Sequence, residues 1–76
     1  PNPVSDYLHI EMNNGRMGKG KVIIYDLTGK TMKTFSFDKH NRFYQKMLSV
    51  NHLENGVYNI TVELNGISNT QPFIKR

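Results

Sequence analysis

The chain has 76 residues, of which 37% are hydrophobic, and it contains neither cysteine nor tryptophan. This length supports one hydrophobic core and a single domain over residues 1–76, and the absence of cysteine excludes disulfides, thiolate metal sites and thiol nucleophiles. Ten Lys and Arg against six Asp and Glu give a formal net charge of +4. The basic residues are interleaved with acids, which is typical of a solvated surface rather than a concentrated site for an anionic partner.

Apolar residues recur with a period of two along most of the chain, which predicts β-strands. In chain order, the alternating positions are Leu8, Ile10 and Met12, then Val22 and Ile24, Phe35 and Phe37, Leu48 and Val50, and finally Tyr58, Ile60, Val62 and Leu64. No stretch has the 3.6-residue period of an amphipathic helix. Six or seven short strands without a long helix predict an all-β fold, and we favour a small antiparallel β-sandwich over a barrel.

Turn-forming dipeptides separate these strands, and each tolerates the positive φ that tight hairpins require. They are Asn14-Gly15, Thr28-Gly29, Asn55-Gly56 and Asn65-Gly66. The last of these is the strongest signal, and it predicts that ITVEL and ISNTQPF pair as antiparallel neighbours. Pro72 has no N–H to donate, so the strand that contains it is expected to be an edge strand or to carry a bulge.

The stretch IIYDLTGKT ends like a phosphate-binding loop, but it does not meet the structural requirements of one. Such a loop needs Gly four residues before its GK[ST] ending and a helix after it, whereas position 24 is Ile and the residues after Thr31 alternate like a strand. We interpret the stretch as a hairpin turn in which Asp26 accepts backbone hydrogen bonds, Gly29 takes positive φ and Lys30 resumes the strand.

Other chemistry has little support in the sequence. His9, His40 and His52 lack metal-ligand spacing, the six acids are spread singly, and no signature groups a nucleophile with a base. We therefore expect no metal, no cofactor and no enzymatic activity. A small basic β-barrel could bind single-stranded nucleic acid, but Phe35 and Phe37 share a strand face as core residues do, so no nucleic-acid partner is expected.

Neither a membrane span nor a signal peptide is expected, since no window approaches 18 apolar residues and no basic segment precedes an apolar run. The chain starts at Pro1 without Met, which suggests a domain excised from a longer protein.

Four segments in a fixed order carry a family resemblance: PNPVSDYLHI, VIIYDLTGK, LSVNHLENGVYNITVELNG and the terminal PFIKR. Together they cover essentially the whole chain and resemble the type A C-terminal sorting domain of the type IX secretion system. The resemblance implies an immunoglobulin-like sandwich that directs an N-terminally attached cargo protein across the outer membrane of Bacteroidota-type bacteria. It also implies transit through the periplasm, recognition by the translocon, removal by a surface sortase-like peptidase, and delivery to the cell surface or the medium.

The resemblance also assigns roles by position. Pro1, Asn2 and Pro3 match the entry motif, Asp26, Leu27, Thr28, Gly29 and Lys30 match the central turn, Gly56 and Tyr58 match a glycine-x-tyrosine element, and Phe73, Ile74, Lys75 and Arg76 match the terminal segment needed for export. Gly29 and Gly56 are expected to set backbone geometry and Tyr58 to pack, whereas Lys30, Lys75 and Arg76 are expected to be exposed and to contact the partner.

Two departures from the family pattern lead to further expectations. The family often has basic residues just before its final apolar pair, but here Gln71 and Pro72 stand at these positions, which predicts a terminal strand that is not bonded along its full length. Residues 37–46 are expected to form a long charged loop. The alternative function is an extracellular adhesion or carbohydrate-binding module, although its usual strip of aromatic residues is missing because the four tyrosines are dispersed. Weak homodimerisation is left open.

Overall fold

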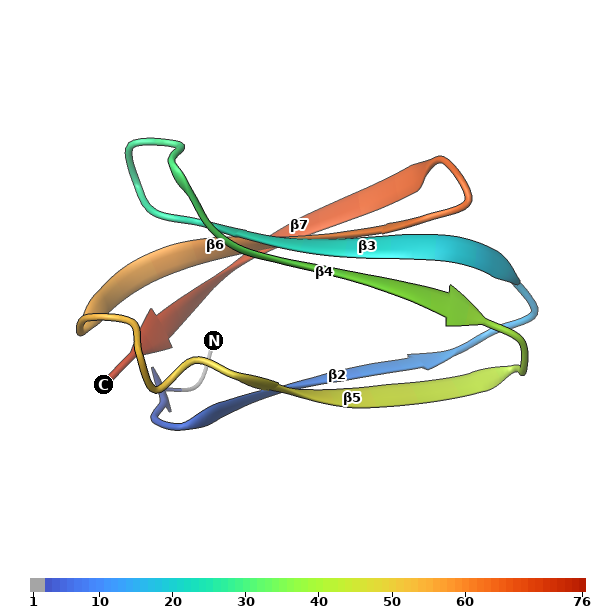
Figure 1. Cartoon of the computed structure of the whole chain (residues 1–76), viewed down its shortest axis with the longest axis horizontal. Helices are drawn as coiled ribbons and strands as arrows, with labels where there is room; N and C mark the ends of the chain where they lie inside the picture. The colour runs from blue at the N-terminus through green and yellow to red at the C-terminus, as the bar shows by residue number, and fades with distance from the viewer. Residues whose placement is uncertain (1–2) are drawn as a thin grey trace.

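The computed structural model describes residues 3–76, and within that range the chain forms seven strands and no helix (Figure 1). The strands are β1 (Pro3–Val4), β2 (Tyr7–Asn13), β3 (Gly18–Tyr25), β4 (Thr31–Lys39), β5 (Phe43–Ser49), β6 (Gly56–Leu64) and β7 (Ile67–Lys75). The predicted all-β fold with six or seven strands is confirmed.

Two sheets of unequal width face each other. The larger sheet has the strand order β1-β7-β6-β3-β4, and the smaller sheet consists of β2 and β5. Figure 1 shows the two sheets as separate layers, with the smaller one below. All pairs are antiparallel except β1 and β7, which run parallel. The sandwich prediction is therefore confirmed, and its immunoglobulin-like connectivity stays a prediction.

Two of the four predicted turns are hairpin turns. Asn65 and Gly66 have φ values of 51° and 84°, and they join β6 to β7 with Leu64 opposite Ile67. Positive φ at both central residues is the requirement of a two-residue type I′ turn. Gly29, with φ of 89°, lies in the turn between β3 and β4.

The other two dipeptides also separate strands, as predicted, but they do not close hairpins, because the chain changes sheets at these points. Asn14-Gly15 lies between β2 of the small sheet and β3 of the large one, and Asn55-Gly56 leads from the β5–β6 connection into β6, which begins at Gly56. A connection between layers cannot be a tight hairpin, since its two strands are not neighbours. The long charged loop expected over residues 37–46 is wrong, because β4 and β5 occupy most of it and leave residues 40–42 as the crossing.

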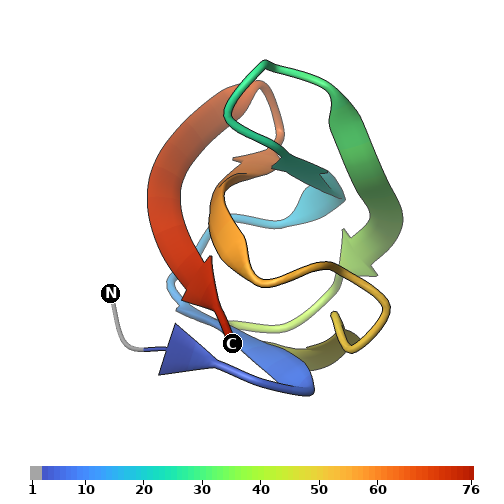
Figure 2. The same ribbon diagram turned by 90° about the vertical axis from the view of Figure 1, so that its left-hand side faces the viewer.

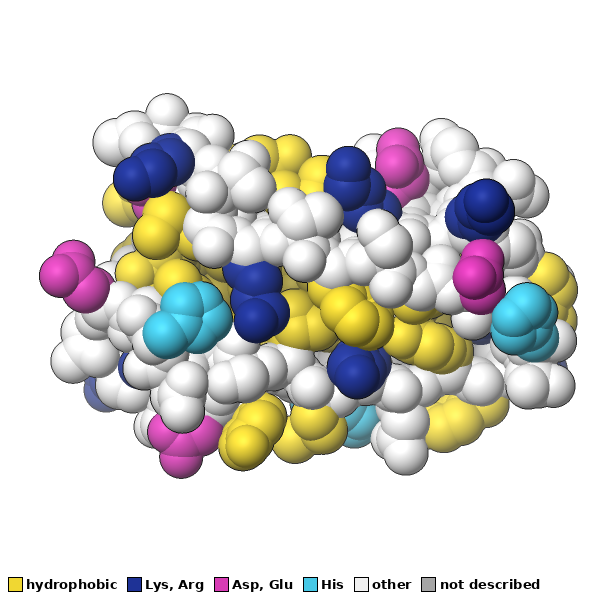
Figure 3. All heavy atoms as spheres, viewed as in Figure 1, with side chains coloured by type: hydrophobic (Ala, Val, Ile, Leu, Met, Phe, Trp, Pro, Cys, Tyr) yellow, Lys and Arg dark blue, Asp and Glu magenta, His cyan; other side chains and the backbone are white. Residues whose placement is uncertain are grey.

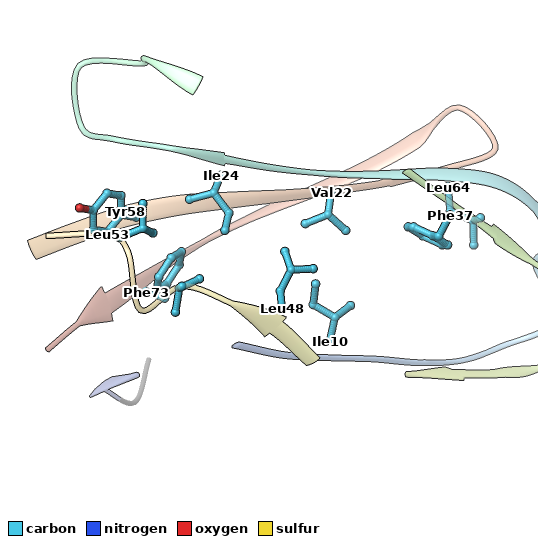
Figure 4. Packing of buried hydrophobic residues seen from close by; sticks show 10 residues of the cluster. Ile10, Val22, Ile24, Phe37, Leu48, Leu53, Tyr58, Leu64 and Phe73 are labelled. Carbon is cyan, nitrogen blue, oxygen red and sulfur yellow. The ribbon is translucent and has the colours of Figure 1, made fainter. Parts of the chain in front are cut away.

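The hydrophobic core lies between the sheets, and most of its buried residues are ones that the alternation selected, with Leu53 and Phe73 in addition (Figure 4). Its buried members are Ile10, Val22, Ile24, Phe37, Leu48, Val50, Leu53, Tyr58, Leu64 and Phe73. The rings of Phe37 and Tyr44 stack with centroids 4.6 Å apart and join β4 to β5. Gly20 lies opposite Phe37, and a Cβ at this glycine would lie 2.1 Å from the Phe37 ring. The ring therefore covers the backbone where Gly20 has no side chain.

Lys39 is the most enclosed charged residue of residues 3–76, with 1% of its surface exposed. Its Nζ donates hydrogen bonds of 2.8 Å to the carbonyl oxygens of Asn14 and Arg16. Burial, with repulsion from Arg42, holds the pKa of Lys39 below its ordinary value. These two hydrogen bonds hold the connection between β2 and β3 against the end of β4.

Pro72 is accommodated without a bulge because of its place in the β6–β7 ladder. Leu64 and Ile67 close the two-residue hairpin as a hydrogen-bonded pair, and alternation along the register then makes Asn59 and Pro72 a non-hydrogen-bonded pair. The nitrogen of Pro72 faces away from β6, so no ladder bond is lost. The edge prediction is confirmed for residues 67–72. The expected interruption of the terminal strand is wrong, since β7 stays in register with β6 from Ile67 to Lys75.

Candidate functional site

The central turn is organised by one carboxylate. Asp26 Oδ1 accepts hydrogen bonds from the Thr28 amide at 2.9 Å, the Thr28 hydroxyl at 2.6 Å and the Lys30 amide at 3.0 Å. The Asp26 amide donates to the Lys30 carbonyl at 2.9 Å and closes the loop. The bond from the Thr28 hydroxyl, followed by the bond from the Lys30 amide, holds the pKa of Asp26 below its ordinary value. The predicted geometry of Asp26 and Gly29 is confirmed, although β4 resumes at Thr31, one residue after Lys30.

This turn presents two different side chains to solvent. Lys30 is exposed, as expected, and Leu27 at the tip is 70% exposed. The sequence analysis gave Leu27 no role in contact. The signal that could have identified it is the turn itself, because an apolar residue following the turn-forming aspartate has no strand face to pack on.

The terminal segment begins in the core. Phe73 is 3% exposed, and its ring stacks on that of Tyr58 with centroids 5.6 Å apart. The Tyr58 hydroxyl donates a 2.7 Å hydrogen bond to the Glu54 carbonyl. The Tyr58 ring therefore joins the start of β6 to the end of β7, in agreement with the packing role expected for it, and its hydroxyl holds the segment before β6.

Lys75 does not lie where the sequence analysis placed it. It was expected to be exposed, but it is 6% exposed. Its side chain lies on the same face of β7 as that of Phe73, because alternate residues share a face, and its Nζ donates to the Arg76 carbonyl at 3.4 Å. A long aliphatic stem makes such burial feasible at a strand end. Lys75 is thus not available for direct contact from this face.

Ile74 and Arg76 are the accessible members of the terminal segment. Ile74 is half-buried on the outer face and lies opposite Pro3 of β1. Arg76 is exposed, and its amide donates a 2.9 Å hydrogen bond to the Val4 carbonyl. The chain end is therefore hydrogen-bonded to Val4, the residue that follows the entry motif, while Pro3 of the motif lies opposite Ile74. Pro1 and Asn2, the remaining residues of the predicted entry motif, lie outside the described residues.

Residues from each of the four matching segments meet at one end of the large sheet, although the segment that contains β6 continues to the hairpin at the other end. Gly56 lies opposite Lys75, Tyr25 lies opposite Asn59, and Pro3 lies opposite Ile74, so β1, the central turn, the start of β6 and the end of β7 share that end. Figures 1 and 2 show this end, which is on the left in the first view and faces the viewer in the second. We call it the motif end.

Charge is not concentrated on the face seen in Figure 3, where Lys and Arg side chains are spread among acids and histidines. Among residues 3–76, no three His, Cys, Asp or Glu side chains are grouped so that they could hold a metal ion. Within the same range, no helix is long and apolar enough to cross a membrane.

An open groove lies along one side of the sandwich, between the edges of β2 and β7. Its volume is about 740 Å³, and its floor includes Ile60, Val62 and Leu64 of β6. The groove exists because two strands face a sheet of five and leave the inner side of β7 uncovered. Gln71 and Asn69, which share the inward face with Phe73, are exposed for this reason.

These features define a small β-sandwich domain with an exposed central turn, an exposed chain end and an open groove along one side. A model of the family described as the secretion system C-terminal sorting domain matches residues 1–76, and the chain belongs to this family. No curated protein and no solved structure shows significant similarity to it.

Membership of this family gives the function in outline. The chain is a type IX C-terminal sorting signal, which implies attachment to a cargo, recognition by the secretion machinery and export to the cell surface or the medium. The family is one of sorting signals and is not catalytic. Between the two functions left open by the sequence, the family supports sorting over adhesion or carbohydrate binding.

Proposed function

We propose that this domain directs an N-terminally attached cargo protein across the outer membrane by presenting its motif end to the type IX translocon. The observation that carries the proposal is that residues of all four family segments meet at that end, with the terminal segment paired with β6 on one side and with β1 on the other. A recognition surface built from segments far apart in the sequence exists only in the folded domain. The translocon therefore recognises a surface of the folded domain rather than a linear peptide.

The proposed route has three steps. The cargo passes through the periplasm with this domain folded at its C-terminal side, the translocon binds the motif end, and the cargo reaches the outer surface. A sortase-like peptidase then cuts upstream of Pro1 and leaves the cargo on the cell surface or in the medium. These steps follow what the resemblance to the family implies.

The proposed residue roles follow from exposure. Lys30, Ile74 and Arg76 contact the partner, because they are accessible at the motif end. Phe73 and Lys75 are positioning residues, because they are buried and hold β7 in place. The remaining motif residues shape the backbone and the turn, namely Pro3, Asp26, Gly29, Gly56 and Tyr58.

Charge reversal at the motif end tests the proposal. In a host with the type IX machinery, we expect Lys30→Glu and Arg76→Glu each to reduce surface delivery of a fused fluorescent reporter by about tenfold, which corresponds to about 1.4 kcal/mol of binding. Lys19→Glu is the matched control, since Lys19 is exposed at the opposite end of β3. Thermal unfolding of each variant checks that the fold is retained. Equal delivery by the folded variants and the control would refute recognition at the motif end.

A further inference from the structure

Two strand edges border the open groove, and only one of them is ready to accept another strand. On β7, the hydrogen-bond alternation turns the backbone groups of Ser68, Thr70 and Pro72 away from β6. Pro72 has no N–H, and β1 covers the edge beyond it at Ile74 and Lys75. This edge therefore offers two backbone donors and is then interrupted.

The edge of β2 has a different character. Hydrogen bonds from the Val50 amide to the Asp6 carbonyl at 2.8 Å and from the Asn14 amide to the Arg42 carbonyl at 3.0 Å flank the β2–β5 ladder. Since both bonds fall on even-numbered residues of this segment, alternation gives the even residues to β5. The N–H and C=O groups of the odd-numbered residues then face the groove side, namely those of Tyr7, His9, Glu11 and Asn13.

Of the devices that commonly block edge pairing, β2 has only the exposed charge of Glu11. Proline, lysine, a bulge and a short strand are the usual protections, and the sequence YLHIEMN contains neither proline nor lysine. Its pairing with β5 has no irregularity over seven residues. The backbone N–H and C=O groups of four alternate residues of β2 are thus available for pairing along a regular strand.

The apolar side chains that line the groove behind this edge are only partly covered by the protein itself. Leu8, Ile10 and Met12 face inward from β2 and line the groove together with the β6 residues of its floor. Leu8, Met12, Ile60 and Val62 are only partly buried although they point between the sheets. A third strand added beside β2 would widen the small sheet and cover these side chains.

We propose that the β2 edge binds an extended segment of a partner protein as an added strand. Alternate apolar side chains of that segment fill the groove, and its backbone pairs with the odd-numbered residues of β2. Charge selects the register: Glu11 is exposed beside His9, with the Glu11 Oε2 atom 3.9 Å from His9 Nε2, and Arg16 lines the groove beyond the end of β2. The segment therefore carries a basic residue opposite Glu11 and an acidic residue toward Arg16.

This inference rests on the proposed function, because it assigns the added strand to a protein of the secretion machinery. The terminal strand is less suited to such pairing than β2. The terminal strand has two neighbours at its end, whereas β2 has one along its whole length.

A binding experiment with a defined probe tests the edge. The probe is a synthetic peptide of about nine alternating valine and threonine residues, with lysine at its centre and glutamate at one end. We expect excess peptide to slow hydrogen exchange of the His9 and Glu11 amides at least tenfold in the wild-type chain. A peptide methylated on alternate backbone nitrogens should give no slowing, because it cannot form the ladder.

Proline substitution identifies the edge that is used. His9→Pro removes an outward donor without breaking a bond to β5, and we expect it to weaken peptide binding at least tenfold. His9→Ala keeps the donor and controls for the side chain, while Ser68→Pro makes the same backbone change on β7, and both should bind as the wild type does. Unchanged binding by His9→Pro, slowed exchange at Ser68 and Thr70 instead, or pairing of β2 only with a second copy of the chain would each overturn the proposal.

Reporter export separates this inference from the function on which it rests. We expect His9→Pro to lower delivery while His9→Ala and Ser68→Pro do not. If Lys30→Glu and Arg76→Glu lower delivery but folded His9→Pro does not, the motif end is the recognition surface and the β2 edge is not used. If His9→Pro alone lowers delivery, the edge inference stands and the proposed role of the motif end fails.

Discussion

Asp26 shows how far single residues could be predicted. The sequence indicated a turn in which Asp26 accepts backbone hydrogen bonds and Gly29 takes positive φ, and both features are present. Such local interactions are predictable because all their partners lie within five residues. Lys75 was predicted wrongly, although the signal was available: it has the same parity as Phe73, as Lys39 has with Phe37. Charge was given more weight than alternation at these strand ends.

Acidification should remove the stabilisation that Asp26 gives the central turn. The pKa of Asp26 is lowered in the folded chain, so its contribution is complete above the unfolded value of about 3.9 and is lost as pH falls through the lower folded value. We expect Asp26→Asn to keep most hydrogen bonds but to show a smaller fall in Tm between pH 6 and pH 2 than the wild type. Thermal unfolding across this range measures the effect, and parallel Tm curves for the two chains would contradict it.

At the scale of elements, strand existence and the β6–β7 hairpin were predictable, whereas the sheet changes were not. A turn dipeptide reports that positive φ is tolerated, but it does not report whether the next strand joins the same sheet. Asn55-Gly56 and Asn65-Gly66 look alike in sequence, yet the first begins a strand in the other sheet and the second closes a hairpin. The difference is decided by which strands can cover the apolar faces, and that is a property of the whole chain.

Moving a proline along β7 tests the alternation of the β6–β7 ladder. Gln71 and Ile60 form a hydrogen-bonded pair in this register. Gln71→Pro therefore removes a ladder bond and leaves the Ile60 carbonyl without its donor, and we expect a loss of about 1 to 3 kcal/mol in the free energy of unfolding. Ser68→Pro, at an outward position, should cost about 0.5 kcal/mol or less. Urea unfolding compares the two, and an equal loss in both variants would show that the alternation is assigned incorrectly.

The order of strands across the molecule lay beyond sequence reasoning. The parallel pairing of β1 with β7 joins residues about seventy positions apart, and the fit of the Phe37 ring over Gly20 depends on the register of β3 with β4. Neither leaves a periodic signal in the sequence. The family match identified the function, while the exposure of each motif residue required the fold.

Truncation of the terminal segment should affect the whole fold. Removal of residues 73–76 takes Phe73 out of the core, where burial of such a ring contributes about 2 to 3 kcal/mol, and deprives β1 of its partner. We expect the truncated chain to lose its cooperative thermal transition, which calorimetry would detect, while removal of Arg76 alone preserves it. A truncated chain that melts cooperatively near the wild-type temperature would contradict this. Loss of export after this truncation therefore does not by itself identify a contact surface, and the point variants are needed.

The parallel alignment of β1 and β7 also determines how the domain bears a load. When a force pulls the cargo away from β1 while the chain end is held at Arg76, the two strands are drawn past each other along their length. The bonds between them, including that from the Arg76 amide to the Val4 carbonyl, are then strained together in shear instead of opening one after another. The attachment point of the cargo and the held chain end thus meet at the β1–β7 pair, which acts as a mechanical clamp. The rest of the sandwich carries tension only after the bonds between these two strands have broken.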